Sequence, residues 1–134
     1  MANEQAAKEW LTLAHHDLNG AKLMFEASHY TDTISYVLHQ SIEKSLKSIL
    51  AFENKSIKKT HNLIELHEIV SLDTFNLSED EILTLSVITT YYSKQKYPNP
   101  NYSLPSQKDI EIALKLASDI LNNICILLGV NLRL

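Results

Sequence analysis

Polar side chains recur at helical spacing between residues 36 and 47, inside an otherwise apolar stretch. They are Tyr36, Gln40, Glu43, Lys44 and Lys47, which share one side of a helical wheel. The two lysines could contact a phosphate or a partner protein, with the amide and the carboxylate orienting them. The same pattern is also typical of a solvated helix face, where Lys47 follows Glu43 at ion-pair spacing. Spacing alone leaves both interpretations open.

A second candidate site lies in the basic linker that follows. Lys55, Lys58 and Lys59 precede Thr60, a plausible N-cap, so a helix N-terminus and three ammonium groups could together hold an anion. The alternative is a solvated lysine-rich loop. His61 could bond either a phosphate or the neighbouring backbone.

Aromatic and basic residues alternate near residue 95. Tyrosines 91, 92, 97 and 102 stand with Lys94 and Lys96, a composition that could stack on nucleobases. The same tyrosines could instead cover one end of a helical bundle, and we favour this structural role.

Several other chemistries are excluded or disfavoured. The chain has no glycine-rich phosphate loop and no nucleophile elbow, and its single cysteine, Cys125, cannot form an internal disulfide. The histidines form no compact ligand set, so neither a metal nor another cofactor is expected. A net charge of −4 opposes broad nucleic-acid binding. Without a signal sequence or a bilayer-length apolar run, we expect a cytoplasmic protein with no membrane association.

The apolar periodicity predicts an all-α fold in one domain, residues 1–134. With only two glycines and three prolines, the chain lacks the turn residues that a protein of many short strands needs. Helices are predicted from residue 3 to about 27, after His29 to about 52, from Thr60, from Ser78 to about 92, and from Ser106 to Gly129. We therefore expect an up-and-down bundle of about five helices.

Two details concern helix packing. Gly20 lies within the first apolar stripe, which continues past it, so we expect close helix packing there rather than a break. The last helix carries more apolar residues than one face needs. Burial on two sides is therefore expected, inside the bundle or across a subunit interface, and we favour a homodimer.

Four motifs together resemble the HEPN family, named for nucleotide binding in higher eukaryotes and prokaryotes. They are Trp10-Leu11 with Ala14, Asp17-Leu18 and Ala21; Gln40-x-x-Glu43-Lys44-x-Leu46-Lys47; Thr60-His61-Asn62-Leu63; and Lys96-Tyr97-Pro98. The resemblance covers nearly the whole chain. It implies a HEPN-like bundle, commonly dimeric, and frequently encoded beside a small nucleotidyltransferase in toxin-antitoxin pairs.

The chain departs from the catalytic members of that family. Many HEPN toxins resemble metal-independent ribonucleases that use Arg-x4-6-His, but the only arginine here is Arg133, with no histidine after it. Lys96 stands where related sequences often have arginine, and no histidine follows it. We therefore assign no catalytic residue and expect a non-catalytic module that binds a nucleotide, a nucleotidyltransferase-type partner, or both. The expected ligand contacts are Gln40, Glu43, Lys44, Lys47, His61, Lys96 and Tyr97.

The alternative is a ribonuclease toxin with a variant active site. Such a site would combine Lys96 and Tyr97 with His61 or His39 from elsewhere in a dimer. The ligand would then be RNA.

Overall fold

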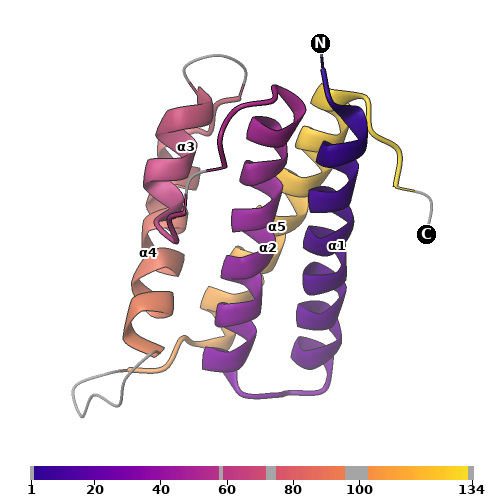
Figure 1. Cartoon of the computed structure of the whole chain (residues 1–134). Coiled ribbons are helices and arrows are strands. Elements are labelled where there is room, and N and C mark those ends of the chain that lie inside the picture. Colours follow the sequence, from indigo (N-terminus) through magenta and orange to yellow (C-terminus); the bar gives the residue numbers. More distant parts are fainter. Residues whose placement is uncertain (1, 58, 72–74, 96–102, 133–134) are drawn as a thin grey trace.

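The computed structural model describes residues 2–57, 59–71, 75–95 and 103–132, and all its regular elements are helices (Figure 1). In chain order they are α1 (Glu4–Glu26), α2 (Thr31–Phe52), α3 (Leu63–Ser71), α4 (Glu79–Gln95) and α5 (Gln107–Leu128). The predicted all-α bundle of about five helices is confirmed.

Helices α1 and α2 form an antiparallel hairpin (Figure 1). The buried face of α1 repeats at alternating four- and three-residue steps: Ala7, Leu11, Ala14, Leu18 and Ala21. Because alanine and serine are small, the two backbones can lie close together, and the Ser41 hydroxyl donates to the Ala14 carbonyl at 2.8 Å. At the open end of the hairpin, the Asn3 amide donates to the Phe52 carbonyl at 2.8 Å.

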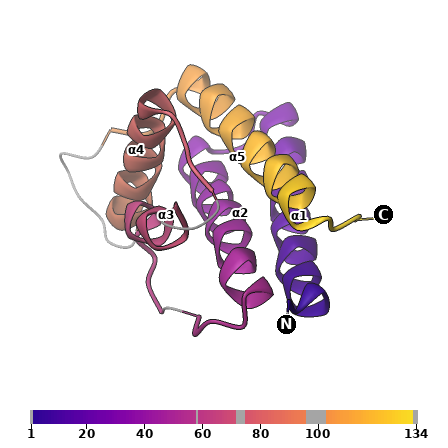
Figure 2. The same cartoon turned by 90° about the horizontal axis from the view of Figure 1, so that it is seen from above.

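Helix α2 lies in the middle of the bundle and packs against each of the other four helices (Figure 2). A helix surrounded in this way must bury polar residues as well as apolar ones. Glu43 and Lys47 are accordingly buried, as is Ser41. A solvated face is therefore the wrong interpretation for Glu43 and Lys47.

The predicted boundaries of α4 and α5 rest on capping interactions that the structure contains. Ser78 and Glu81 exchange backbone-to-side-chain bonds of 2.9 and 3.2 Å, and Ser106 and Asp109 do the same at 2.9 and 3.0 Å. Each pair satisfies two amides at the start of a helix. Helix α5 ends at Gly129, which adopts the left-handed conformation with φ of 66°.

The start of α3 differs from the prediction. Asn62, not Thr60, caps the helix, because its side-chain oxygen accepts from the amides of Ile64 and Glu65 at 3.0 and 3.1 Å. The Thr60 hydroxyl instead accepts from the Asn62 amide at 3.1 Å. Threonine and asparagine are both good N-caps. The Thr60 hydroxyl is used in a local turn with the Asn62 amide, so Asn62 caps the helix.

The wide apolar arc of α5 is largely buried within this chain. Its core-facing residues are Ile110, Ala113, Leu116, Ala117, Ile120, Leu121, Ile124 and Leu128. Ile126 and Leu127 are exposed by 79% and 45%, and Cys125 is partly buried, which raises the pKa of its thiol. Burial inside this chain therefore explains why apolar residues cover so much of the circumference of α5.

None of the described helices is both long and apolar enough to cross a bilayer.

Gly20 lies within an unbroken α1, but the expected close packing is wrong. A Cβ placed at this residue would have no heavy atom within 4 Å. The glycine therefore costs helix stability without allowing a neighbouring helix to approach.

Replacing Gly20 with alanine should raise the free energy of unfolding by about 0.5–1 kcal/mol, because alanine restricts the unfolded chain and favours helix. Urea unfolding measures the change. Gly129→Ala is the matched control: its positive φ should make that variant less stable by about 1 kcal/mol. A Gly20→Ala protein no more stable than the wild type would contradict this account.

Candidate functional site

The candidate site is built around the buried carboxylate of Glu43 on α2. Its Oε1 accepts from His61 Nδ1 at 2.8 Å, and its Oε2 accepts from Lys47 Nζ at 3.0 Å. His61 belongs to the linker between α2 and α3. The one carboxylate therefore joins a linker residue and a residue of its own helix.

His39, one turn before Glu43, is fully buried beneath the same linker. Its Nε2 bonds the backbone carbonyl of His61 at 2.7 Å. Because a carbonyl only accepts, His39 carries its proton on Nε2, and burial lowers the pKa of the ring to about 4. Its Nδ1 has no hydrogen-bond partner among the described residues and lies 3.9 Å from Glu43 Oε1. His39 is thus a neutral ring that holds the linker against α2.

Tyr92 of α4 covers this cluster with its ring. Its centroid lies 4.0 Å from that of His39 and 5.4 Å from that of His61, and Tyr36 stacks on it at 5.3 Å. Tyr92 is buried, which raises the pKa of its hydroxyl, whereas Tyr36 is 38% exposed. The exposed edge of the site therefore consists of Tyr36 and His61.

The two lysines in the polar set of α2 both pair with a carboxylate. Lys47 bonds Glu43 and lies 5.9 Å from the centroid of the Trp10 ring, while Lys44 bonds Asp17 of α1 at 2.7 Å. Since each ammonium has a carboxylate partner, neither lysine presents uncompensated positive charge to a phosphate. Lys44 is also directed to α1, apart from the cluster at Glu43.

The remaining predicted contacts have different outcomes. The structure brings together Glu43, Lys47 and His61, whereas Gln40 is only half-buried on α2. Lys96 and Tyr97 lie outside the described residues.

The linker is a weaker anion site than expected. The Asn62 side chain already accepts hydrogen bonds from amides at the start of α3, where an anion would bind. The ammonium of Lys55 lies 3.7 Å from the Glu53 carboxylate. Lys58 is outside the described residues, and Lys59 is exposed. Lys59 therefore remains as an exposed cation two residues before His61.

Two site residues were not among the predicted ligand contacts: His39 was named only in the alternative ribonuclease site, and Tyr92 only in the aromatic segment. His39 stands four residues before Glu43, a spacing that places both on one helix face and could have indicated the contact. Tyr92 was predicted to cover the bundle, and its ring packing agrees with that role. Its position on both histidines depends on the packing of α4, which no local pattern encodes.

The arrangement orients His61 for hydrogen bonding or proton transfer. Glu43 accepts a hydrogen bond from Nδ1–H, so in the neutral ring the Nε2 lone pair is left to accept from a hydroxyl group. The His61 side chain is 54% exposed, which makes this nitrogen accessible. Among the described residues, no group of three histidine, cysteine or carboxylate side chains is placed to hold a metal ion.

Comparison with known proteins gives a family and a fold. The HEPN domain matches residues 7–127, nearly the whole chain. No curated protein matches. The crystal structure of TT1696 from Thermus thermophilus is 23% identical with a TM-score of 0.71, covering 88% of this chain and 94% of that one. The structure of ST0689, an archaeal HEPN homologue, is 20% identical with a TM-score of 0.70, covering 91% and 97%.

Stability should fall on acidification, and His39 should account for part of the loss. Its folded pKa of about 4 lies below the ordinary value of 6.5, so the unfolded chain binds the extra proton as pH falls from about 6.5 to 4. The difference between these two pKa values corresponds to a loss of at most roughly 3 kcal/mol in the free energy of unfolding. His39→Gln keeps a donor for the His61 carbonyl and should show a shallower slope of unfolding free energy against pH.

Burial also lowers the pKa values of His15 and His67, so the variant should retain some slope. Urea unfolding at a series of pH values measures both proteins. Identical slopes would show that His39 is not held neutral by the fold.

Proposed function

Because this chain belongs to the HEPN domain family, we propose that it is a single non-catalytic HEPN module that binds a nucleotide at the exposed edge of His61 and Tyr36. A small nucleotidyltransferase-type protein would be its partner in a two-component system. The observation that carries the proposal is the buried Glu43 carboxylate, which fixes Nδ1 of His61 and leaves Nε2 to a ligand in a side chain that is 54% exposed.

The residues of this edge match the parts of a nucleotide. The face of Tyr36 offers a stacking surface for a base, supported from behind by Tyr92. The Nε2 lone pair of His61 can accept from a ribose hydroxyl. Lys59, two residues earlier and exposed, can approach a phosphate as the linker's cation. The contacts are few, so the expected affinity is modest.

Assembly is the second part of the proposal. Ile126 and Leu127 remain exposed near the end of α5 after the core has been filled. This apolar surface supports a homodimer, as expected from the resemblance to the family. Size-exclusion chromatography with light scattering would give the oligomeric state, and co-purification with a neighbouring nucleotidyltransferase would identify the partner.

Calorimetry with ATP, GTP and a short single-stranded RNA tests the nucleotide site. His61→Ala and Tyr36→Ala should each weaken binding by about tenfold, the loss expected for one stacking or hydrogen-bond contact. Matched controls are His16→Ala and Tyr30→Ala, which change exposed residues of the same types elsewhere and should bind normally. If the wild-type protein gives no heat with any of these ligands, the nucleotide proposal fails.

A ribonuclease with a variant site is the second candidate, and the Glu43–His61 pair favours it. A carboxylate that holds Nδ1–H prepares the other nitrogen to take a proton. In RNA, Nε2 would take the proton of the 2′-hydroxyl as O2′ attacks the adjacent phosphorus. The P–O5′ bond would break, leaving a 2′,3′-cyclic phosphate, and the departing 5′ oxygen would take a proton from water. The histidine of Arg-x4-6-His, which this chain lacks, would then be replaced by one from the linker.

Incubating purified protein with RNA decides between the two candidates. If cleavage occurs, His61→Ala should slow it by about a hundredfold or more, as expected for a lost general base, and His16→Ala should not. If expression is harmless to cells and RNA stays intact, the ribonuclease alternative is wrong.

A further inference from the structure

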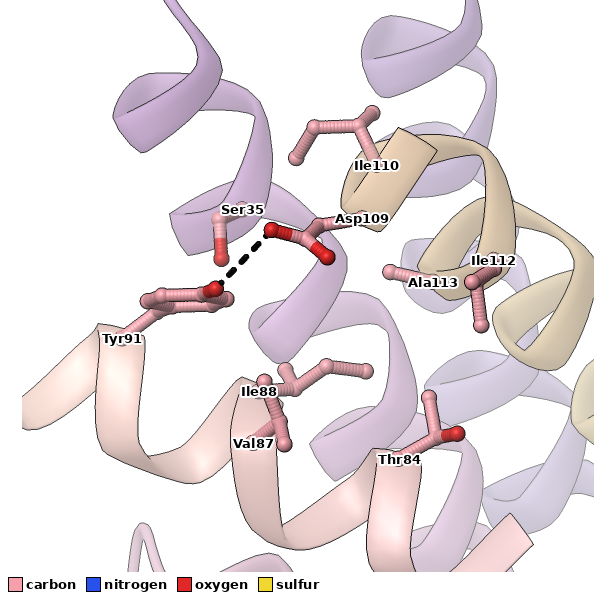
Figure 3. A pocket seen from close by; sticks show the side chains of 9 residues that line it. All are labelled: Ser35, Thr84, Val87, Ile88, Tyr91, Asp109, Ile110, Ile112 and Ala113. Carbon is pink, nitrogen blue, oxygen red and sulfur yellow. Dashed lines mark hydrogen bonds between the residues drawn. The ribbon is translucent and has the colours of Figure 1, made fainter. Parts of the chain in front are cut away.

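A separate small pocket lies between α4 and α5, with α2 forming its inner side (Figure 3). Its volume is about 140 Å³, and most of its lining is apolar: Val87, Ile88, Ile110, Ile112 and Ala113. Three lining residues carry the polar groups of interest, namely Ser35, Tyr91 and Asp109. None of them belongs to the cluster at Glu43.

The Asp109 carboxylate lines this apolar pocket. Its Oδ2 accepts from the Tyr91 hydroxyl at 3.1 Å and from the Ser106 amide at 2.9 Å. Among the residues whose side chains the structure describes, none forms a hydrogen bond with Oδ1 and no lysine pairs with this carboxylate. The bond from the Ser106 amide, chiefly, lowers the pKa of Asp109, so the group is ionised at neutral pH.

The Ser35 hydroxyl is a second polar group without a partner. Ser35 is only 2% exposed, and its Oγ forms no hydrogen bond with the described part of the chain. Figure 3 shows its side chain beside Tyr91 and Asp109, at the inner wall of the pocket. A buried hydroxyl normally has a partner, so Ser35 Oγ is available to a polar group that enters the pocket.

The surroundings of the pocket favour a positive charge. An adjoining depression shares Thr84 and Ile112 with it. That depression is lined by Asp80, Glu81 and Asp119, with Lys115 as its one lysine. Lys115 is itself 3.2 Å from Asp119. Three carboxylates therefore face one lysine beside the pocket.

We propose that this pocket binds a small organic cation: a primary ammonium group on a compact apolar body. The ammonium would donate to Asp109 Oδ1 and Ser35 Oγ, and the body would lie against Ile88 and Ala113. The size agrees, because a cavity of about 150 Å³ holds benzene, whereas sites for larger ligands have roughly 300–1,000 Å³. A nucleotide does not fit.

Titration with benzylamine and benzyl alcohol, followed by amide chemical shifts in NMR, tests the proposal. The two probes have similar shapes and differ in charge. Benzylamine should bind the wild-type protein about tenfold more tightly, the difference expected for a charge-assisted hydrogen bond. Shifts should concentrate on α4 and the start of α5.

Three variants sharpen the experiment. Asp109→Asn keeps the oxygen that caps α5 and should remove the preference for the amine, while Ala113→Leu should fill the pocket and abolish binding of both probes. Asp119→Asn, in the adjoining depression, is the control and should bind both normally. The dispersion of the amide spectrum shows whether each variant is folded.

The proposal is overturned if the amine and the alcohol bind equally, if neither saturates, or if Asp119→Asn rather than Asp109→Asn removes the preference. It is also overturned if free amines fail while a blocked lysine peptide binds, because the pocket would then receive a partner's side chain. These results are independent of nucleotide binding at His61.

Discussion

The buried carboxylate of Glu43 is the interaction on which the candidate site depends. A carboxylate inside a helical bundle is stable only when its lone pairs have donors, and Lys47 and His61 supply them at 3.0 and 2.8 Å. Removing one partner of a buried pair typically costs about 3–5 kcal/mol. The same anion therefore holds the linker between α2 and α3 and sets the direction of the His61 ring.

The position of α2 explains why these groups are buried. It packs against every other helix, so each of its faces meets a neighbour. Toward α1, the Ser41 hydroxyl reaches the Ala14 carbonyl and Lys44 pairs with Asp17. Toward the linker and α4, His39 bonds the His61 carbonyl and stacks on Tyr92. One central helix thus carries both the structural contacts and the candidate site.

Most of the helical fold could be predicted from the sequence, because periodicity and capping are local. The Ser106 cap and the Gly129 end are examples. The site was predicted only in part: Glu43, Lys47 and His61 do meet, but Lys44 turns to Asp17. The burial of the site, the ring stack on His39 and Tyr92, and the Asn62 cap depend on how α2, α4 and the linker pack, which one sequence without that geometry does not specify.

The tautomer of His61 shows whether Glu43 orients the ring. Two-dimensional nitrogen-proton NMR, recorded where the ring is neutral, reports which of its nitrogens carries the proton. The account predicts a proton on Nδ1, held by Glu43, and a shift toward the Nε2–H form in Glu43→Ala. A His61 ring with its proton on Nε2 in the wild-type protein, or one unchanged in that variant, would contradict it.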